Sequence, residues 1–200
     1  MGVAAMIMLY AGLRIGEVLA LEWTDIDLEA RTITVSKART LFKNQASVKS
    51  PKTKAGIRVV PIPEILYDVL HSVRKKQGLV CPDINGKLMS LNAQKNAWNA
   101  FINHLNECAG GKKGSGPRKP VMVIDRITPH MLRHTYATML FDAGVDVKSA
   151  QKFLGHSDIE VTLEVYTHLS KFKEDKAIRA LDEHLKERKK EPKIRLLRAL

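Results

Sequence analysis

A histidine and arginine cluster is the densest group of chemically versatile side chains in this sequence. It lies in the segment His130-Met131-Leu132-Arg133-His134. Helical positions three and four residues apart share a face, so its three polar side chains can address one ligand. Two histidines four residues apart also match the HExxH metalloproteases, but Met131 stands where that chemistry requires a glutamate base. The cluster alone therefore fits a shared ligand site, a metal site, or histidines that only cap and pack.

Further motifs accompany this cluster, and their order along the chain is informative. They are Ala11-Gly12-Leu13-Arg14-Ile15-Gly16-Glu17, Pro51-Lys52-Thr53-Lys54 followed by Arg58-Val59-Val60-Pro61, Leu154-Gly155-His156-Ser157, and Tyr166 in Val165-Tyr166-Thr167-His168. Together with the histidine cluster, they resemble the tyrosine recombinases of the phage and conjugative-transposon integrase type. The resemblance spans residues 11–166, and five motifs in one order are far more specific than any single motif.

The resemblance implies a DNA strand transferase that needs no cofactor and no metal. Tyr166 would attack a phosphodiester, form a 3′-phosphotyrosyl bond and release a 5′-hydroxyl, so the bond energy stays in the protein–DNA ester. Displacement at phosphorus builds negative charge on the non-bridging oxygens, which fixed guanidinium groups stabilise with paired hydrogen bonds. Arg14 and Arg133 resemble the family's two arginines that clamp the scissile phosphate.

The remaining site residues would transfer protons, bind the phosphate or support the structure of the site. A tyrosine hydroxyl with a pKa near ~10 is a poor nucleophile, so a base or a positive field must help to deprotonate it. His130 resembles the residue usually given that role, and His156 the residue that donates a hydrogen bond to the phosphate. The departing 5′ oxygen needs a proton, which a hairpin lysine can supply as general acid. Lys52 and Lys54 both lie in that turn, and its place just after a strand favours Lys52. Glu17 resembles an acidic position that supports the site structurally.

Positive charge dominates the composition and points to a polyanionic partner. The 200 residues include 33 lysines and arginines against 21 aspartates and glutamates, a formal net charge of +12. Residues 31–58 hold eight basic side chains and no acidic one, which favours a nucleic-acid surface. Beyond the catalytic candidates, the predicted DNA-contacting residues are Arg39, Lys43, Lys49, Lys54 and Arg58.

The apolar pattern predicts an α+β fold that is mainly α-helical, with one small antiparallel sheet near residues 31–61. β-branched residues alternate over 31–37 and again over 57–61, with a hairpin tip at 50–56. A proline and an N-cap threonine predict a helix start at Thr128-Pro129, and residues 110–119 predict a basic loop. Helices are expected over residues 3–13, 15–21, 63–77, 91–106, 129–142, 145–154, 159–169 and 172–190.

The resemblance also sets expectations about domains and partners. Full-length relatives carry a DNA-clamping domain before this one, and 13 residues precede Arg14, so residues 1–200 are expected to be the catalytic domain without its N-terminal core-binding domain. Residues 170–200 would form a C-terminal helix and tail whose apolar end packs in trans on a neighbouring protomer. The implied partners are double-stranded DNA attachment sites and further copies of the chain, in a tetrameric synapse.

The location expected for the protein is the cytoplasm of a bacterium, with a bacterial or phage-encoded gene and no membrane contact. The longest uncharged run covers residues 1–13, which is shorter than the ~20 apolar residues of a membrane span. The two cysteines, Cys81 and Cys108, form neither a CxxC pair nor a disulfide framework.

Three other functions stay open at this stage. Residues 136–154 imitate a helix-turn-helix, as in a DNA-binding module without chemistry. A type IB topoisomerase shares the tyrosine chemistry but relaxes supercoils, which plasmid relaxation without a specific site would reveal. A metal-dependent nuclease could use the histidines, and cleavage that persists in EDTA would eliminate it.

Overall fold

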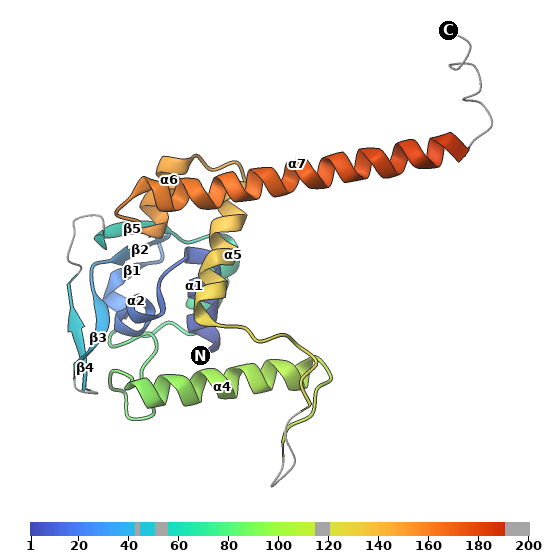
Figure 1. The fold of residues 1–200 in the computed structure, drawn as a ribbon. Coiled ribbons are helices and arrows are strands. Elements are labelled where there is room, and N and C mark those ends of the chain that lie inside the picture. The colour runs from blue at the N-terminus through green and yellow to red at the C-terminus, as the bar shows by residue number, and fades with distance from the viewer. Residues whose placement is uncertain (43–44, 51–55, 115–120, 191–200) are drawn as a thin grey trace, which may run out of the picture.

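The structure is a computed structural model that describes residues 1–200 except 43–44, 51–55, 115–120 and 191–200. Helices dominate it, with short strands between the second and third helices (Figure 1). The helices are α1 (Gly2–Ala11), α2 (Ile15–Ala20), α3 (Glu64–Ser72), α4 (Leu91–Cys108), α5 (Pro129–Asp142), α6 (Val147–Leu154) and α7 (Ile159–Lys190), with a 3-10 turn at Trp23–Asp25. The strands are β1 (Ile26–Asp27), β2 (Thr32–Val35), β3 (Ala38–Phe42), β4 (Gln45–Lys49) and β5 (Arg58–Pro61). The predicted fold class, α+β and mainly α-helical, is confirmed.

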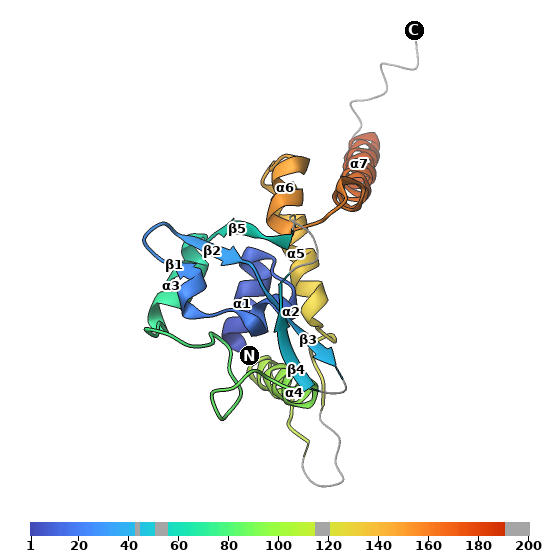
Figure 2. The same ribbon diagram turned by 90° about the vertical axis from the view of Figure 1, so that its left-hand side faces the viewer.

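The strands form two separate sheets where one was predicted. β2 lies between β1 and β5 and pairs antiparallel with both, with Ile33 opposite Val60. β3 and β4 form a second antiparallel pair, which lies along one side of the molecule (Figure 2). The alternation of β2 and β5 is strong because Ile33, Val35 and Val60 are buried. The described side chains of β3 and β4 are exposed or half-buried, so this hairpin leaves a weak hydrophobic signal. The tip predicted at 50–56 lies mostly outside the described residues.

The first core is built around α1. This helix is apolar on every side, which suits a central position, and Ile7, Met8 and Ala11 are fully buried. It packs against α5 and α3. It ends, as predicted, at Gly12, which adopts a left-handed conformation with φ of 66°. A Cβ at Gly12 would lie 2.2 Å from the Tyr136 ring, so the close approach of α1 and α5 depends on this glycine.

A second core joins α5, α6 and α7. Its buried members are Tyr136, Ala137, Leu140, Ala150, Leu154 and Tyr166. α5 begins as predicted, with Thr128 as its N-cap and proline in its first turn.

α7 runs unbroken from Ile159 to Lys190, whereas two helices separated near residue 170 were predicted. No glycine or proline interrupts residues 156–190, so nothing local ends the first helix. The distal part of α7 extends away from the body (Figure 1). In the ranges that the structure describes, no helix is long and apolar enough to cross a membrane.

Candidate active site

A buried carboxylate organises the first part of the site. Glu17, in the first turn of α2, is 7% exposed. Its Oε2 accepts from the backbone N of Arg14 at 2.7 Å and from Arg58 Nη2 at 2.8 Å. Its Oε1 accepts from Arg14 Nη1 at 3.1 Å and from Arg58 Nη1 at 3.0 Å. Burial alone would raise the pKa of Glu17, but the hydrogen bonds and charges of Arg58 and Arg14 lower it. The carboxylate is therefore ionised and holds both arginines.

The structure corrects the placement predicted for Arg58. Sequence reasoning put it among the surface residues that contact DNA, yet its side chain is only 2% exposed. Two of its guanidinium nitrogens bind Glu17, and its Nε donates to the carbonyl of Phe153 at 2.8 Å. Every nitrogen of the guanidinium is thus engaged inside the protein. Arg58 ties the β5 strand to α2 and α6 and supports the site from below the surface.

Arg133 is held by the main chain of two distant segments. It is 5% exposed, and its guanidinium donates to the carbonyls of Gly12 and Leu154. Arg14, which is more exposed, donates from Nη2 to the carbonyl of Gly155 at 3.2 Å. Burial first, and then the charge of Arg14, lowers the pKa of Arg133 to about 9. The two arginines that were predicted to clamp a phosphate therefore converge on the same turn at the end of α6.

His156 follows that turn and joins the cluster. Its Nδ1 lies 2.8 Å from the hydroxyl of Thr162 on α7. Burial first, and then the charges of Arg133, Arg14 and Arg58, lower its pKa to about 4. The ring is therefore neutral near pH 7, and a neutral imidazole still donates one hydrogen bond.

His130 is exposed at the start of α5 and lies against His134, with 4.4 Å between ring centroids. Partial burial first, and then the charges of His134, Arg133 and Arg14, lower its pKa. A neutral His130 can accept a proton, which the role of base requires. Sequence reasoning gave His134 no catalytic role. In the structure, His134 contributes to the lowered pKa of His130.

The Tyr166 hydroxyl makes its hydrogen bond outside the arginine cluster. Its hydroxyl donates to the carbonyl of Val145 at 3.1 Å, and its ring lies edge-on to Phe141 with centroids 5.1 Å apart. Only 8% of the residue is exposed. Burial and the charge of Asp146 raise the pKa of the hydroxyl. Of the predicted catalytic residues that the structure describes, the arginines and histidines lie in one electrostatic cluster and the tyrosine does not.

The predicted DNA-contacting side chains have different surroundings. Lys49 is exposed at the end of β4. Arg39 donates to the carbonyl of Met89, just before α4, at 2.9 Å, and to the Gln94 side chain in the first turn of that helix. Lys43, Lys52 and Lys54 lie outside the described residues, so the choice between the two candidate general acids stays a prediction.

Two lysines that the motifs did not single out lie next to the cluster. A cavity of about 260 Å³ is lined by Ile57, Arg58, Lys148, Gln151, Lys152 and His156. Lys148 and Lys152 stand four residues apart on α6 and share its face. They extend the positive charge from the arginines across α6. Their spacing on a helix that leads to His156 was a signal available in the sequence.

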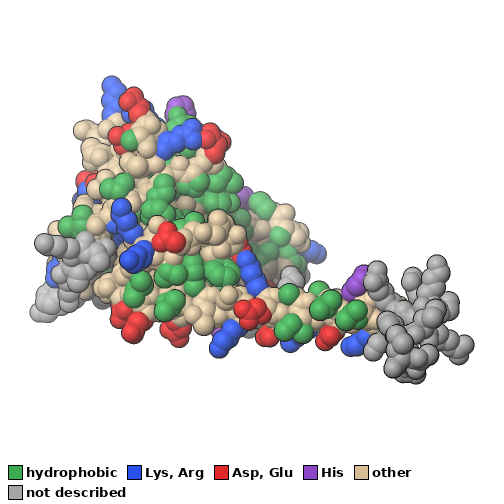
Figure 3. Space-filling view, turned by 90° about the horizontal axis from the view of Figure 1, so that it is seen from above, with side chains coloured by type: hydrophobic (Ala, Val, Ile, Leu, Met, Phe, Trp, Pro, Cys, Tyr) green, Lys and Arg blue, Asp and Glu red, His purple; other side chains and the backbone are tan. Residues whose placement is uncertain are grey.

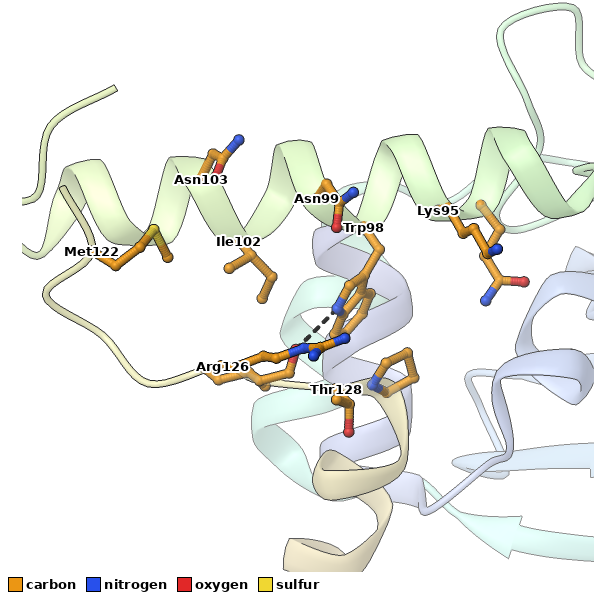
Figure 4. Close-up of a pocket in the computed structure, with 11 residues that line it drawn as sticks. Lys95, Trp98, Asn99, Ile102, Asn103, Met122, Arg126 and Thr128 are labelled. Carbon is orange, nitrogen blue, oxygen red and sulfur yellow. Dashed lines mark hydrogen bonds between the residues drawn. The ribbon is translucent and has the colours of Figure 1, made fainter. Parts of the chain in front are cut away.

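A larger cavity lies elsewhere, between α4 and the segment that leads into α5 (Figure 4). It has a volume of about 610 Å³. Trp98 forms part of its wall and donates from its indole nitrogen to the carbonyl of Ile127 at 3.1 Å. Lys95, Asn99 and Arg126 add polar groups to the wall. No predicted catalytic residue in the part of the chain that the structure describes lines this cavity, so its size does not make it the reaction site.

Comparison with known proteins places the chain in a family. It matches the phage integrase family over residues 2–173. A tyrosine recombinase XerC-like protein of Caldanaerobacter subterraneus subsp. tengcongensis is 32% identical over 184 residues, which cover 86% of this chain and 46% of that protein. The transposase from transposon Tn916 of Enterococcus faecalis is 31% identical over 82% of this chain and 41% of its own length.

A solved relative agrees with these matches. The Tn1549 transposon integrase in complex with circular intermediate DNA has a TM-score of 0.65 and 28% identity, covering 82% of this chain and 54% of that chain. The chain thus spans about half the length of these relatives. With the family matched over most of its residues, this chain belongs to the phage integrase family of tyrosine recombinases.

Proposed function

We propose that this chain is the catalytic domain of a site-specific recombinase that cuts and rejoins double-stranded DNA through a 3′-phosphotyrosine intermediate. The observation that carries this proposal is the convergence of Arg14, Arg133 and His156 from three distant parts of the chain. The three arginines of the cluster and Glu17 have a net charge of about +2 at neutral pH. A partly buried cluster with that excess charge suits a phosphodiester, whose reaction develops further negative charge.

The reaction assigns one task to each group. Arg14 and Arg133 bind the non-bridging oxygens, and His156 donates a third hydrogen bond to them. The Tyr166 oxygen attacks phosphorus while its proton passes to His130, and the bond to the 5′ oxygen breaks. Lys52 or Lys54 gives a proton to that leaving oxygen. Rejoining runs the same steps in reverse, with a 5′-hydroxyl as the attacking group.

Tyr166 must move before it can react. The movement breaks its hydrogen bond to Val145 and its contact with Phe141, and a single hydrogen bond contributes only about 0.5–1.5 kcal/mol to stability. DNA binding can supply free energy of that size. The observed position is therefore that of a resting site.

We propose double-stranded attachment sites and further copies of the chain as partners, assembled as a tetramer in the bacterial cytoplasm. Related integrases have been solved with DNA, and exposed Lys49 offers a phosphate contact on this chain. Along the projecting part of α7, Ile178, Leu181 and Leu185 are 58%, 57% and 47% exposed. Their spacing puts them on one face, and hydrophobic side chains follow that helix in Figure 3. This face, with residues 191–200, would pack in trans on a neighbouring protomer.

A covalent-trapping assay on nicked suicide DNA tests the proposal. The wild-type chain should form a DNA adduct in EDTA. Tyr166→Phe should abolish the adduct while DNA binding remains. Arg133→Ala should slow adduct formation at least about 10²-fold, as removal of a transition-state donor does. Adducts that survive Tyr166→Phe would assign the nucleophile elsewhere, and binding without any adduct would favour the DNA-binding module.

A further inference from the structure

A buried threonine that is not among the motifs named above contacts His156. Thr162 lies in the first turns of α7, one helical turn before Tyr166, and has no exposed surface. Its Oγ1 is 2.8 Å from Nδ1 of His156. Among the described residues, this is the only hydrogen bond that the Thr162 side chain makes. The contact links the histidine to the helix that carries the nucleophile.

The burial of the hydroxyl decides the direction of this hydrogen bond. A buried O–H group that finds no acceptor loses its hydrogen bond to water without replacement, which is unfavourable. Nδ1 of His156 is the acceptor within reach of Thr162, so the hydroxyl donates and Nδ1 accepts. A proton on Nδ1 would instead leave the threonine hydrogen without a partner.

Burial first, and then the positive charges around it, keep the His156 ring neutral, so the position of its single N–H determines what the ring can do. The groups that face it are Arg14, Arg58 and Arg133, with His134 on α5 and the two cavity lysines on α6, Lys148 and Lys152. Burial is the largest cause that lowers the pKa of His156 to about 4, and the positive charges of Arg133, Arg14 and Arg58 follow. The imidazolium is therefore disfavoured, and the ring carries one hydrogen on one of its two nitrogens.

We infer that Thr162 is a positioning residue that fixes His156 in the tautomer with hydrogen on Nε2. With Nδ1 occupied as an acceptor, Nε2 presents its N–H as a donor to the phosphate oxygen. In the other tautomer Nε2 would present a lone pair, which a phosphate oxygen repels. This inference rests on the proposed function only for the identity of the phosphate. The tautomer itself is a property of the free protein.

The backbone beside the ring is held as well. Gln151 Nε2 donates to the carbonyl of His156 at 3.2 Å, and the His156 N–H donates to the Gln151 carbonyl at the same distance. The threonine thus orients a side chain whose main chain is already fixed on α6. A second helix, α7, supplies the Thr162 hydroxyl, whose contact with Nδ1 determines that the hydrogen of His156 is on Nε2.

The direct test is nitrogen-15 NMR of the full chain at pH 7, with His156 assigned by its absence from His156→Gln. The wild type should show a protonated Nε2 and an unprotonated Nδ1. Thr162→Val keeps the size of the side chain but removes the hydroxyl, so it should give a mixture of tautomers. Thr162→Ser should keep the wild-type pattern. A wild-type spectrum with hydrogen on Nδ1 would overturn the inference.

Adduct kinetics on nicked suicide DNA test the consequence. Thr162→Val should react about 10- to 100-fold more slowly, a loss typical when a hydrogen-bond partner that orients a functional histidine is removed. Thr162→Ser should stay within about threefold of wild type. In the His156→Gln background, Thr162→Val should have no further effect. Wild-type rates in Thr162→Val, or an equal loss in both backgrounds, would refute a role through His156. If the wild type forms no adduct, the proposed function fails, and the NMR result still decides the tautomer. Should Thr162→Val fail to fold, the wild-type and Thr162→Ser spectra remain decisive.

Discussion

Replacing Glu17 by alanine should destabilise the protein strongly because it leaves Arg58 buried without its counter-charge. The Arg58 side chain is 2% exposed and the Glu17 side chain 8%, and two hydrogen bonds of 2.8 and 3.0 Å join them. Removing one partner of a buried ion pair typically costs about 3–5 kcal/mol of unfolding free energy. In a chain of this size each kcal/mol lowers Tm by about 2–4 °C, so the expected fall is roughly 6–20 °C.

Urea unfolding at several pH values gives this prediction its sharpest form. The pKa of Glu17 is lowered in the folded state from an ordinary value of 4.5. Its stabilising contribution is therefore complete well above pH 4.5 and is lost as the pH falls through the folded pKa. The difference between wild type and Glu17→Ala should be largest at neutral pH and shrink in acid.

Two further variants test whether the loss of stability comes from the buried unpaired charge or from the loss of any salt bridge. Glu64→Ala breaks the exposed pair with Arg31, in which the side chains are 67% and 45% exposed, and should change stability much less. Replacing both Glu17 and Arg58, as Glu17→Leu with Arg58→Met, should cost less than the sum of the single changes, because no charge is left unpaired. A loss below about 1 kcal/mol in Glu17→Ala at pH 7 would refute the reasoning, since it would match an exposed pair.

Other expected outcomes follow from the same contacts. Gly12→Ala should lower Tm more than Gly144→Ala, because both glycines have positive φ, but only at Gly12 would the new Cβ meet another residue, 2.2 Å from Tyr136. His156→Gln should flatten the pH dependence of stability between pH 6.5 and about 4, where the folded histidine stays neutral while the unfolded one gains a proton; an unchanged profile would contradict the lowered pKa. DNA binding should weaken with salt at a log–log slope of about −0.9 per phosphate contact, so roughly −4 to −5 for about five contacts, and a salt-insensitive affinity in a titration would oppose phosphate binding.

Local signals predicted the parts of the fold that local chemistry controls. The left-handed Gly12 ends α1, and Thr128 with the following proline starts α5, each where the sequence indicates. The division of α7 near residue 170 was wrong because the change there is in charge pattern alone, and charged residues continue a helix readily. The β3–β4 hairpin was missed because its described residues are exposed or half-buried and lack the alternation that a buried face imposes.

The sequence predicted which residues belong to the candidate site better than it predicted their burial and contacts. Family motifs identify Arg14, Arg133 and His156, and the structure brings them together. The burial of Arg58 depends on Glu17, 41 residues away, and no motif records such a partner. The position of the Tyr166 hydroxyl likewise depends on a carbonyl 21 residues earlier in the chain. Burial and partner choice over such separations arise from tertiary packing.

The carbonyls that hold the arginines have an electrostatic consequence. Arg133 donates to Gly12 and Leu154, and Arg14 donates to Gly155; each acceptor lies at the end of α1 or α6, where the helix dipole is negative. A carboxylate in the same place would orient a guanidinium but cancel its charge. A peptide dipole orients it and leaves the full charge available. The domain can therefore keep Arg133 rigid and still strongly attractive to an anion before any ligand binds.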